Sequence, residues 1–110
     1  MEIKYRAWDS YQKKMYKWDE ICEMDKKGSL TLSNLLNNRI KHIKPMQFIG
    51  LTDKNGKEIY EGDVWLPGFN GLHAEIVKYE AENCVYNISK YYKGKGKVIG
   101  NIHENKSNLE

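Results

Sequence analysis

The sequence has few of the residues that build a disulfide scaffold or a membrane span. Only two cysteines, Cys22 and Cys84, occur among its 110 residues. They form neither a C-x-x-C motif nor a Cys/His zinc spacing, so we expect reduced, partly buried thiols. No apolar run approaches the roughly 18 residues of a transmembrane helix, and the N-terminal sequence lacks the pattern of a secretory signal. These absences predict a cytoplasmic protein.

An excess of one charge sign is also missing. The 18 basic and 15 acidic residues leave a formal charge of +3, which permits nucleic-acid binding without indicating it. A chain of this length typically forms one domain with one modest core. We therefore expect a single domain over residues 1–105, followed by a frayed polar tail over residues 106–110.

Alternating apolar and polar residues predict several short strands. The pattern begins at Ile3 and returns at residues 15–18, which indicates an N-terminal hairpin. Further strands are predicted within residues 46–53, 57–68, 72–80, 84–92 and 97–104. Five to seven strands joined by turns indicate a mainly β fold, a small antiparallel barrel or roll.

One short helix is predicted in the first half of the chain. Apolar residues from Leu32 to Ile43 follow one helical face, and Thr31 or Ser33 is available as the N-cap. Pro45 should stop this helix, because proline lacks a backbone donor and restricts the residue before it. The charged segment Glu23–Ser29 reads as a connection.

The stretch LTDKNGKEIYEGDVW, residues 51–65, contains the strongest turn signals. Asn55 and Gly56 predict a two-residue type I′ hairpin turn, while Gly62 and Asp63 predict a second tight corner before a strand. The same stretch is rich in oxygen ligands, but the glycine and glutamate positions do not fit an EF-hand loop. We interpret these residues as structural turns.

Catalytic and metal motifs are absent from the sequence. His42, His73 and His103 fall in no metal-binding spacing, and no serine or cysteine has a nucleophile signature. The carboxylates of Glu58, Glu61 and Asp63 could form an acid–base pair or bind a divalent cation as a nuclease or hydrolase would, but solvated strand edges and corners explain them as well. We expect a non-enzymatic protein without a cofactor, a bound metal or a small-molecule substrate.

Two stretches are candidate binding surfaces. Lysines can neutralise phosphates and tyrosines can stack on bases, so the segment KYYKGKGK suggests nucleic-acid contacts by Lys90, Tyr91, Tyr92, Lys93, Lys95 and Lys97. The alternative is a solvated hairpin loop. An apolar stripe on the predicted helix could support self-association, or it could cover the domain's own sheet; its residues are Leu32, Leu35, Leu36 and Ile40.

Three segments in order, IKYRAWDSYQKKM, MQFIGLTDKNGKEIYEGDVW and VIGNIHEN, resemble the YopX family of bacteriophage and prophage proteins. The resemblance covers almost the whole chain except residues 18–45. It implies an SH3-like barrel, encoded by phages or prophages of mostly Gram-positive bacteria. It implies no reaction, cofactor or ligand, so no site residues are transferred.

Three hypotheses about function follow. The leading one is a non-enzymatic phage or prophage accessory protein in the cytoplasm of a bacterial host, which binds a protein partner or forms a homo-oligomer. Its support is the lack of catalytic spacing and the abundance of aromatic residues, which are enriched in interface cores. The second is nucleic-acid binding by Lys90 to Lys97. The third is a cation-dependent hydrolase or nuclease using Glu58, Glu61 or Asp63.

Overall fold

The computed structural model describes residues 3–68, 73–90 and 95–104. The chain divides into two compact units, one that ends at Gln47 and one that begins at Phe48. The expectation of a single domain stays a prediction. No helix in the described ranges has the length and apolar character needed to cross a membrane.

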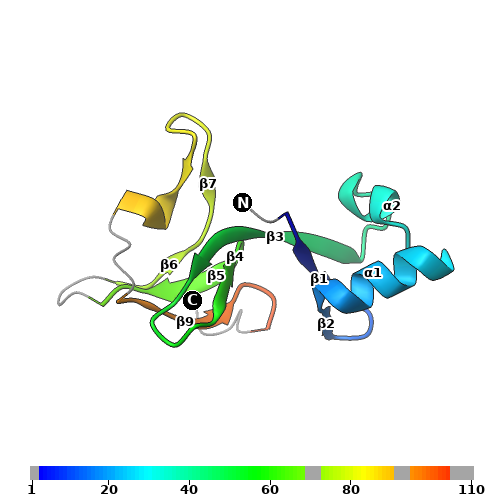
Figure 1. The fold of residues 1–110 in the computed structure, drawn as a ribbon, viewed down its shortest axis with the longest axis horizontal. Helices are drawn as coiled ribbons and strands as arrows, with labels where there is room; N and C mark the ends of the chain where they lie inside the picture. The colour runs from blue at the N-terminus through cyan, green and yellow to red at the C-terminus, as the bar shows by residue number, and fades with distance from the viewer. Residues whose placement is uncertain (1–2, 69–72, 91–94, 105–110) are drawn as a thin grey trace. The chain divides into compact units, whose positions relative to one another are not determined.

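The N-terminal unit contains the predicted hairpin. Strand β1 (Tyr5–Asp9) pairs antiparallel with β2 (Lys14–Tyr16), and on its other side β1 pairs with the first half of β3 (Ile43–Thr52) (Figure 1). Ala7, which is fully buried, lies opposite Tyr16 on one strand and Pro45 on the other. The hairpin is thereby confirmed, although its return strand ends at Tyr16.

A helix follows where the sequence predicted a connection. Helix α1 (Trp18–Lys27) has acidic residues in its first turn and basic residues in its last turn, both of which favour a helix through its dipole. It ends at Gly28, whose φ of 74° is the left-handed conformation that glycine adopts without a steric penalty. The buried Ile21 faces the core. The prediction of a connection was wrong because the charges follow the capping pattern of a helix.

The predicted helix exists but is shorter than its apolar pattern. Helix α2 (Leu32–Leu36) starts at Thr31, one of the two predicted caps, whose hydroxyl accepts a hydrogen bond from the Asn34 N–H at 3.2 Å. Asn38 has a φ of 56°, so the chain leaves the helical conformation well before Pro45. The core of this unit contains Ala7, Tyr16, Ile21, Leu30, Leu35 and Ile43.

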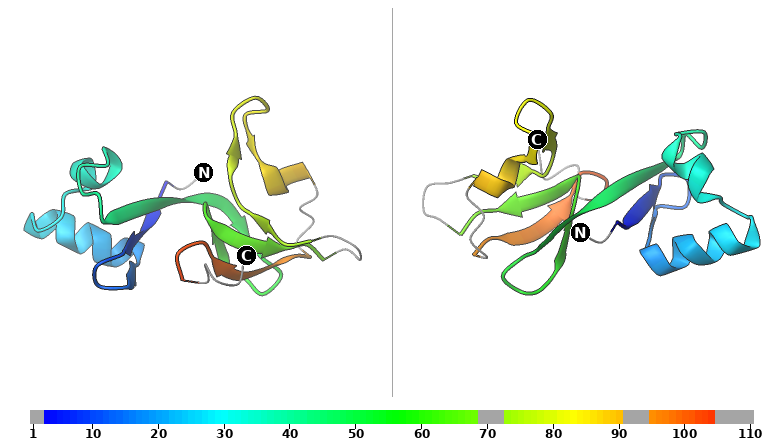
Figure 2. Two further views of the ribbon diagram at one scale, coloured as in Figure 1. Left: turned by 180° about the vertical axis from the view of Figure 1, so that it is seen from behind. Right: turned by 45° about the horizontal axis from the view of Figure 1, so that its top comes forward.

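The C-terminal unit is built from short antiparallel strands. The second half of β3 pairs with β4 (Glu58–Tyr60), while β5 (Asp63–Leu66) pairs with β6 (Glu75–Ile76) and β9 (Lys97–Asn101). Strands β7 (Tyr79–Glu80) and β8 (Val85–Tyr86) form a hairpin that extends away from the β6–β5–β9 sheet (Figures 1 and 2). The mainly β, antiparallel fold class is confirmed, with two helices in place of one.

Two predicted strands are interrupted in this unit. The segment 72–80 gives β6 and β7, separated at Val77, whose N–H and C=O bond to Asp63 and Gly62 instead of continuing the ladder. Within the described part of the segment 84–92, the chain forms β8 and then the short 3-10 helix η1 (Asn87–Lys90). At this break, the Val77 side chain packs into a core with Ile49, Ile59, Trp65 and Ile88.

The turn at Asn55 and Gly56 forms, but it is of a different type. Gly56 has a φ of 81°, whereas Asn55 does not have the positive φ that a type I′ turn requires. The Gly56 N–H instead donates to the Asp53 carbonyl at 3.0 Å, so the turn spans Asp53 to Gly56. The Asp53 carboxylate sets the geometry of this turn, because it accepts hydrogen bonds from the N–H groups of Asn55 and Lys57 at 2.8 and 2.9 Å.

The second predicted corner is confirmed. Gly62 has a φ of 85° between β4 and β5. The fully buried Asp63 carboxylate then accepts the Tyr60 N–H at 2.8 Å across the corner. This bond explains why an acid follows the glycine at the start of a buried strand.

Candidate functional site

A cavity of about 520 Å³ lies beside β6 and β7 in the C-terminal unit. We call it the β6–β8 groove and define it by its lining residues, Val64, Ala74, Glu75, Ile76, Lys78, Glu80 and Asn87. Val64 and Ile76 pair across β5 and β6, so both side chains lie on the same face of that sheet. Ile76 is 41% exposed, while Val64 is buried and forms part of the wall.

The Asn87 side chain closes one side of this groove. Its amide N–H donates to the Ile76 carbonyl at 2.8 Å, and its amide oxygen accepts the Lys78 N–H at 3.0 Å. The Asn87 backbone N–H also donates to the Lys78 carbonyl at 3.0 Å. The Asn87 side-chain amide therefore takes the place of a neighbouring strand beside β6. It occupies backbone groups that an added strand would use.

The β7–β8 hairpin adds exposed apolar side chains next to the groove. Val85 is 43% exposed and lies opposite Glu80, a groove residue, whereas Tyr79 lies opposite Tyr86 on the other face. The Tyr79 and Tyr86 rings meet edge to face with centroids 5.4 Å apart. A hydrogen bond with the Cys84 thiol is the main cause that raises the pKa of Tyr79, so its phenol stays neutral at physiological pH.

A second candidate surface forms where the β3–β4 turn meets the start of β9. The Lys54 N–H donates to the Gly96 carbonyl at 3.0 Å, and the Val98 N–H donates to the Asp53 carboxylate at 3.0 Å. These bonds bring Lys54 and Lys57 into the same region as Lys95 and Lys97. We call these four lysines the basic corner.

The Asp53 carboxylate at the base of this corner is 6% exposed. Burial alone would raise its pKa, but hydrogen bonds from the N–H groups of Val98, Lys57 and Asn55 outweigh that cost and lower it. Asp53 therefore stays ionised at neutral pH, with its lone pairs directed at backbone amides.

The lysine segment predicted to contact nucleic acid is described only in part. Lys95 is exposed and Lys97 is half-buried at the start of β9, while Lys90 ends η1. Tyr91, Tyr92 and Lys93 lie outside the described residues. Gly96 is buried and lies directly against the Trp65 ring. A Cβ atom at this position would therefore overlap the ring carbons. This glycine therefore makes room for a tryptophan.

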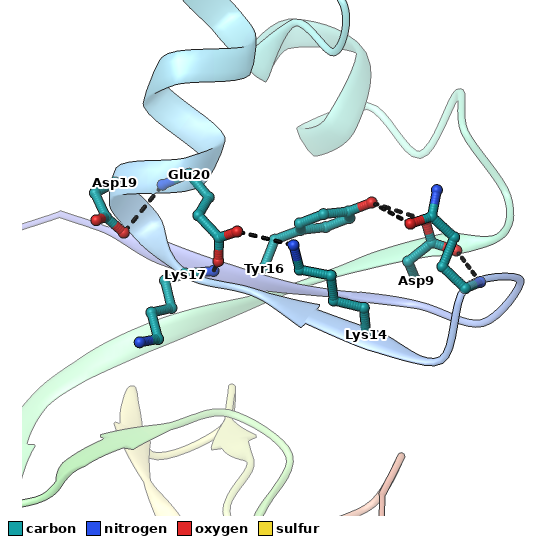
Figure 3. Close-up of polar contacts among 7 residues, drawn as sticks. Asp9, Lys14, Tyr16, Lys17, Asp19 and Glu20 are labelled. Atoms are coloured by element: carbon teal, nitrogen blue, oxygen red, sulfur yellow. Dashed lines mark hydrogen bonds and ion pairs between the residues drawn. The ribbon is translucent and has the colours of Figure 1, made fainter.

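The N-terminal unit holds a third polar group of residues around Tyr16 (Figure 3). The Tyr16 hydroxyl donates to the Asp9 carboxylate at 3.2 Å, and the other Asp9 oxygen accepts the N–H groups of Tyr11 and Gln12 at 2.9 and 3.0 Å. The Gln12 N–H bond is the main cause that lowers the pKa of Asp9. Burial, followed by the Asp9 hydrogen bond, raises the pKa of Tyr16.

An ion pair lies on the other side of the Tyr16 ring. The Lys14 ammonium is 3.0 Å from the Glu20 carboxylate and 4.9 Å from the centroid of the Tyr16 ring (Figure 3). Glu20 also accepts the Lys17 N–H at 3.0 Å at the start of α1. Asp9 caps the hairpin turn and Glu20 caps the start of α1, while Tyr16 and Lys14 bond to these two carboxylates, so the cluster connects the hairpin to α1.

The sequence model of the YopX protein family matches residues 4–110. The chain belongs to the YopX family. The structure of this YopX protein is similar to the crystal structure of protein EF1440 from Enterococcus faecalis, with a TM-score of 0.63 and 24% identity. The similarity covers 100% of this chain and 99% of that chain, and it shows a shared fold. A search of curated proteins finds no match.

The candidate catalytic residues of the YopX protein have structural partners. Asp63 caps the β4–β5 corner, and Glu58 accepts a hydrogen bond from the Tyr60 hydroxyl at 3.1 Å. His42 stacks on the Tyr11 ring with centroids 4.0 Å apart. Within the described residues, no three His, Cys, Asp or Glu side chains gather closely enough to hold a metal ion. Both cysteines are free thiols; Cys22 is half-buried, as expected, but Cys84 is exposed at a hairpin turn.

The leucine stripe is divided between the core and the surface. Leu35 is fully buried, and Leu32 and Ile40 pack against the same core. Leu36 is 39% exposed. The stripe therefore covers its own unit at three of its four positions, which is the alternative interpretation left open by the sequence.

The sequence did not identify those residues of the β6–β8 groove and of the basic corner whose position depends on long-range pairing. Ile76 and Val85 were placed in strands without a surface role, and Lys54 and Lys57 were treated only as neighbours of a turn. Periodicity gives no signal that Val64 pairs with Ile76. A turn motif likewise does not reveal that its first loop residue bonds to Gly96.

Proposed function

We propose that this YopX protein is a non-enzymatic phage or prophage accessory protein that binds a protein partner through the β6–β8 groove in the cytoplasm of a bacterial host. The observation that carries the proposal is the 41% exposure of Ile76 beside a cavity of about 520 Å³. Exposed apolar surface rimmed by polar residues marks interaction sites, and the anchors of an interface pack into pockets.

The chemistry of the groove indicates the kind of partner. Its apolar residues are Val64, Ala74 and Ile76, and its charged residues are Glu75, Lys78 and Glu80. Two carboxylates and one ammonium favour a partner segment that places an apolar side chain next to a basic residue. Asn87 already occupies backbone groups of β6, so recognition through side chains is favoured over addition of a strand.

The lining residues favour binding over catalysis. Among the described residues, the lining includes no serine, cysteine or histidine that could act as a nucleophile or an imidazole base. The carboxylates considered for a hydrolase, Glu58, Glu61 and Asp63, do not line it.

The test compares two variants, each of which replaces an exposed isoleucine with lysine at positions of similar accessibility. Ile76→Lys charges the groove, whereas Ile99→Lys charges β9 at a residue that is 48% exposed and does not line the groove. Immobilised wild-type protein is incubated with an extract of phage-infected host cells, and captured proteins are quantified by mass spectrometry. We expect a partner that is lost with Ile76→Lys and kept with Ile99→Lys.

Light scattering of the same three proteins tests self-association, the other form of the hypothesis. An oligomer that dissociates with Ile76→Lys and persists with Ile99→Lys would identify a second copy as the occupant. A strict monomer that captures nothing, or a partner lost equally with both variants, would contradict the groove proposal.

A further inference from the structure

Four lysines from two distant segments share one surface of the C-terminal unit. Lys54 and Lys57 belong to the turn between β3 and β4, and Lys95 and Lys97 flank Gly96 at the start of β9. Lys54, Lys57 and Lys95 are exposed. The groove proposal uses none of these residues.

Backbone hydrogen bonds fix the spacing of these lysines. The Lys54 N–H bonds to the carbonyl of Gly96, the residue between Lys95 and Lys97, at 3.0 Å. Two residues further along β9, Val98 bonds to the Asp53 carboxylate at 3.0 Å. Lys97 itself pairs with Leu66 in the β5–β9 ladder. The backbone that carries these lysine side chains is therefore held in place by hydrogen bonds.

Two carboxylates next to the corner, in the described part of the chain, are hydrogen-bonded within the fold. Asp53 is buried and accepts three backbone N–H groups. Glu58, the first residue of β4, accepts the Tyr60 hydroxyl. The Asp53 carboxylate is thus directed at backbone amides, while Lys54, Lys57 and Lys95 are exposed residues.

We propose that the basic corner binds the phosphate backbone of nucleic acid without reading the bases. Lysines act as point charges that neutralise phosphates and release counterions, which produces affinity that does not depend on sequence. The described corner offers ammonium groups and no aromatic stacking platform. Gly96 contacts Trp65, so the phosphate contacts come from side chains and not from a glycine cradle.

The experiment measures binding of a fluorescent DNA duplex and a single strand to the full-length chain by polarisation over a series of salt concentrations. Lys54→Gln combined with Lys95→Gln removes two charges from the corner. Lys26→Gln combined with Lys41→Gln removes two charges from exposed lysines of the N-terminal unit and is the matched control. Circular dichroism confirms that all proteins are folded.

For the wild type we expect salt-sensitive binding, with a Kd on the order of 10⁻⁴ to 10⁻⁶ M at physiological salt. The corner variant should lower the slope of log K against log salt by about 1.8 for duplex DNA, since each phosphate contact contributes about 0.9. The control should keep the wild-type slope. Equal binding of different sequences supports contact with the backbone alone.

Three outcomes would overturn the proposal. The first is the absence of binding to either DNA at low salt. The second is an equal loss of affinity in both double variants, which would reflect net charge alone. The third is displacement of DNA by polyglutamate at the same charge concentration, which would identify an acidic protein as the ligand. Loss of the groove partner in the Ile76→Lys variant with unchanged DNA binding would separate this site from the proposed function.

Discussion

The Asp53 carboxylate joins the β3–β4 turn to Val98, a residue 45 positions later in the chain, through a hydrogen bond of 3.0 Å. The same carboxylate shapes the turn through Asn55 and Lys57. One side chain therefore determines both the local turn and its attachment to β9.

Replacing Asp53 should destabilise the protein strongly. Asp53→Ala leaves three backbone N–H groups without their acceptor, and we expect a loss of about 2–4 kcal/mol in the free energy of unfolding. Urea denaturation followed by circular dichroism measures it. Glu82→Ala, at an exposed residue of the β7–β8 turn, is the control and should change stability by less than about 0.5 kcal/mol. Equal stabilities for the two variants would refute the role of Asp53.

Stability should fall in acid. Asp9 and Asp53 both have a pKa lowered from 3.8 in the folded state. Because the folded protein binds their protons less readily than the unfolded chain, their contribution is present above the unfolded pKa and is lost as pH falls through the folded pKa. We expect the urea midpoint to decrease from pH 5 to pH 2. Asp53→Asn should reduce this dependence, and an unchanged midpoint in the wild type would contradict the expectation.

Gly96→Ala should destabilise the start of β9. A methyl group at this position overlaps the buried Trp65 ring, so either the ring or the strand must move. Gly56→Ala is the comparison, because the φ of 81° at this position is strained for alanine, whereas the space around it is open. Backbone strain alone costs about 1–2 kcal/mol. We expect a larger loss for Gly96→Ala, together with a shift in tryptophan fluorescence that Gly56→Ala does not produce.

The leucine stripe can be tested at two adjacent residues. Leu35→Ala should cost about 2–5 kcal/mol, because it removes a fully buried side chain and leaves a cavity. Leu36→Ala should cost less than about 1 kcal/mol, since that side chain is 39% exposed. Thermal unfolding with light scattering records both stability and oligomeric state. A change of oligomeric state in Leu36→Ala at unchanged stability would restore the stripe as an interface.

The sequence predicted those elements whose causes are local. Alternation identified β1, and the hydroxyls of Thr31 and Ser33 gave two candidates for the start of α2, of which Thr31 is the cap. The charged residues of α1 carried a helix signal as well, from the acidic first turn to Gly28, but they were assigned to a solvated connection. The turn at Asn55 was correctly located and wrongly typed, because the Asp53 side chain selects the geometry.

The rest depends on contacts between distant residues. The strand predicted over residues 72–80 breaks at Val77 because Gly62 and Asp63 bond to its backbone. Likewise, the groove requires the pairing of Val64 with Ile76, and the basic corner requires the bond from Lys54 to Gly96. No spacing within either segment encodes these pairings, so only part of the basic corner, Lys95 and Lys97, was predicted.

Strand β3 has a practical consequence for dissecting this protein. Its first half pairs with β1 and its second half with β4, yet Ile43–Thr52 forms a single strand, with a register shift between Phe48 and Thr52. The boundary between the compact units, at Gln47 and Phe48, falls inside that strand. A fragment cut there would divide β3 and leave each half without the rest of its strand. A fragment designed for expression must therefore contain all of β3.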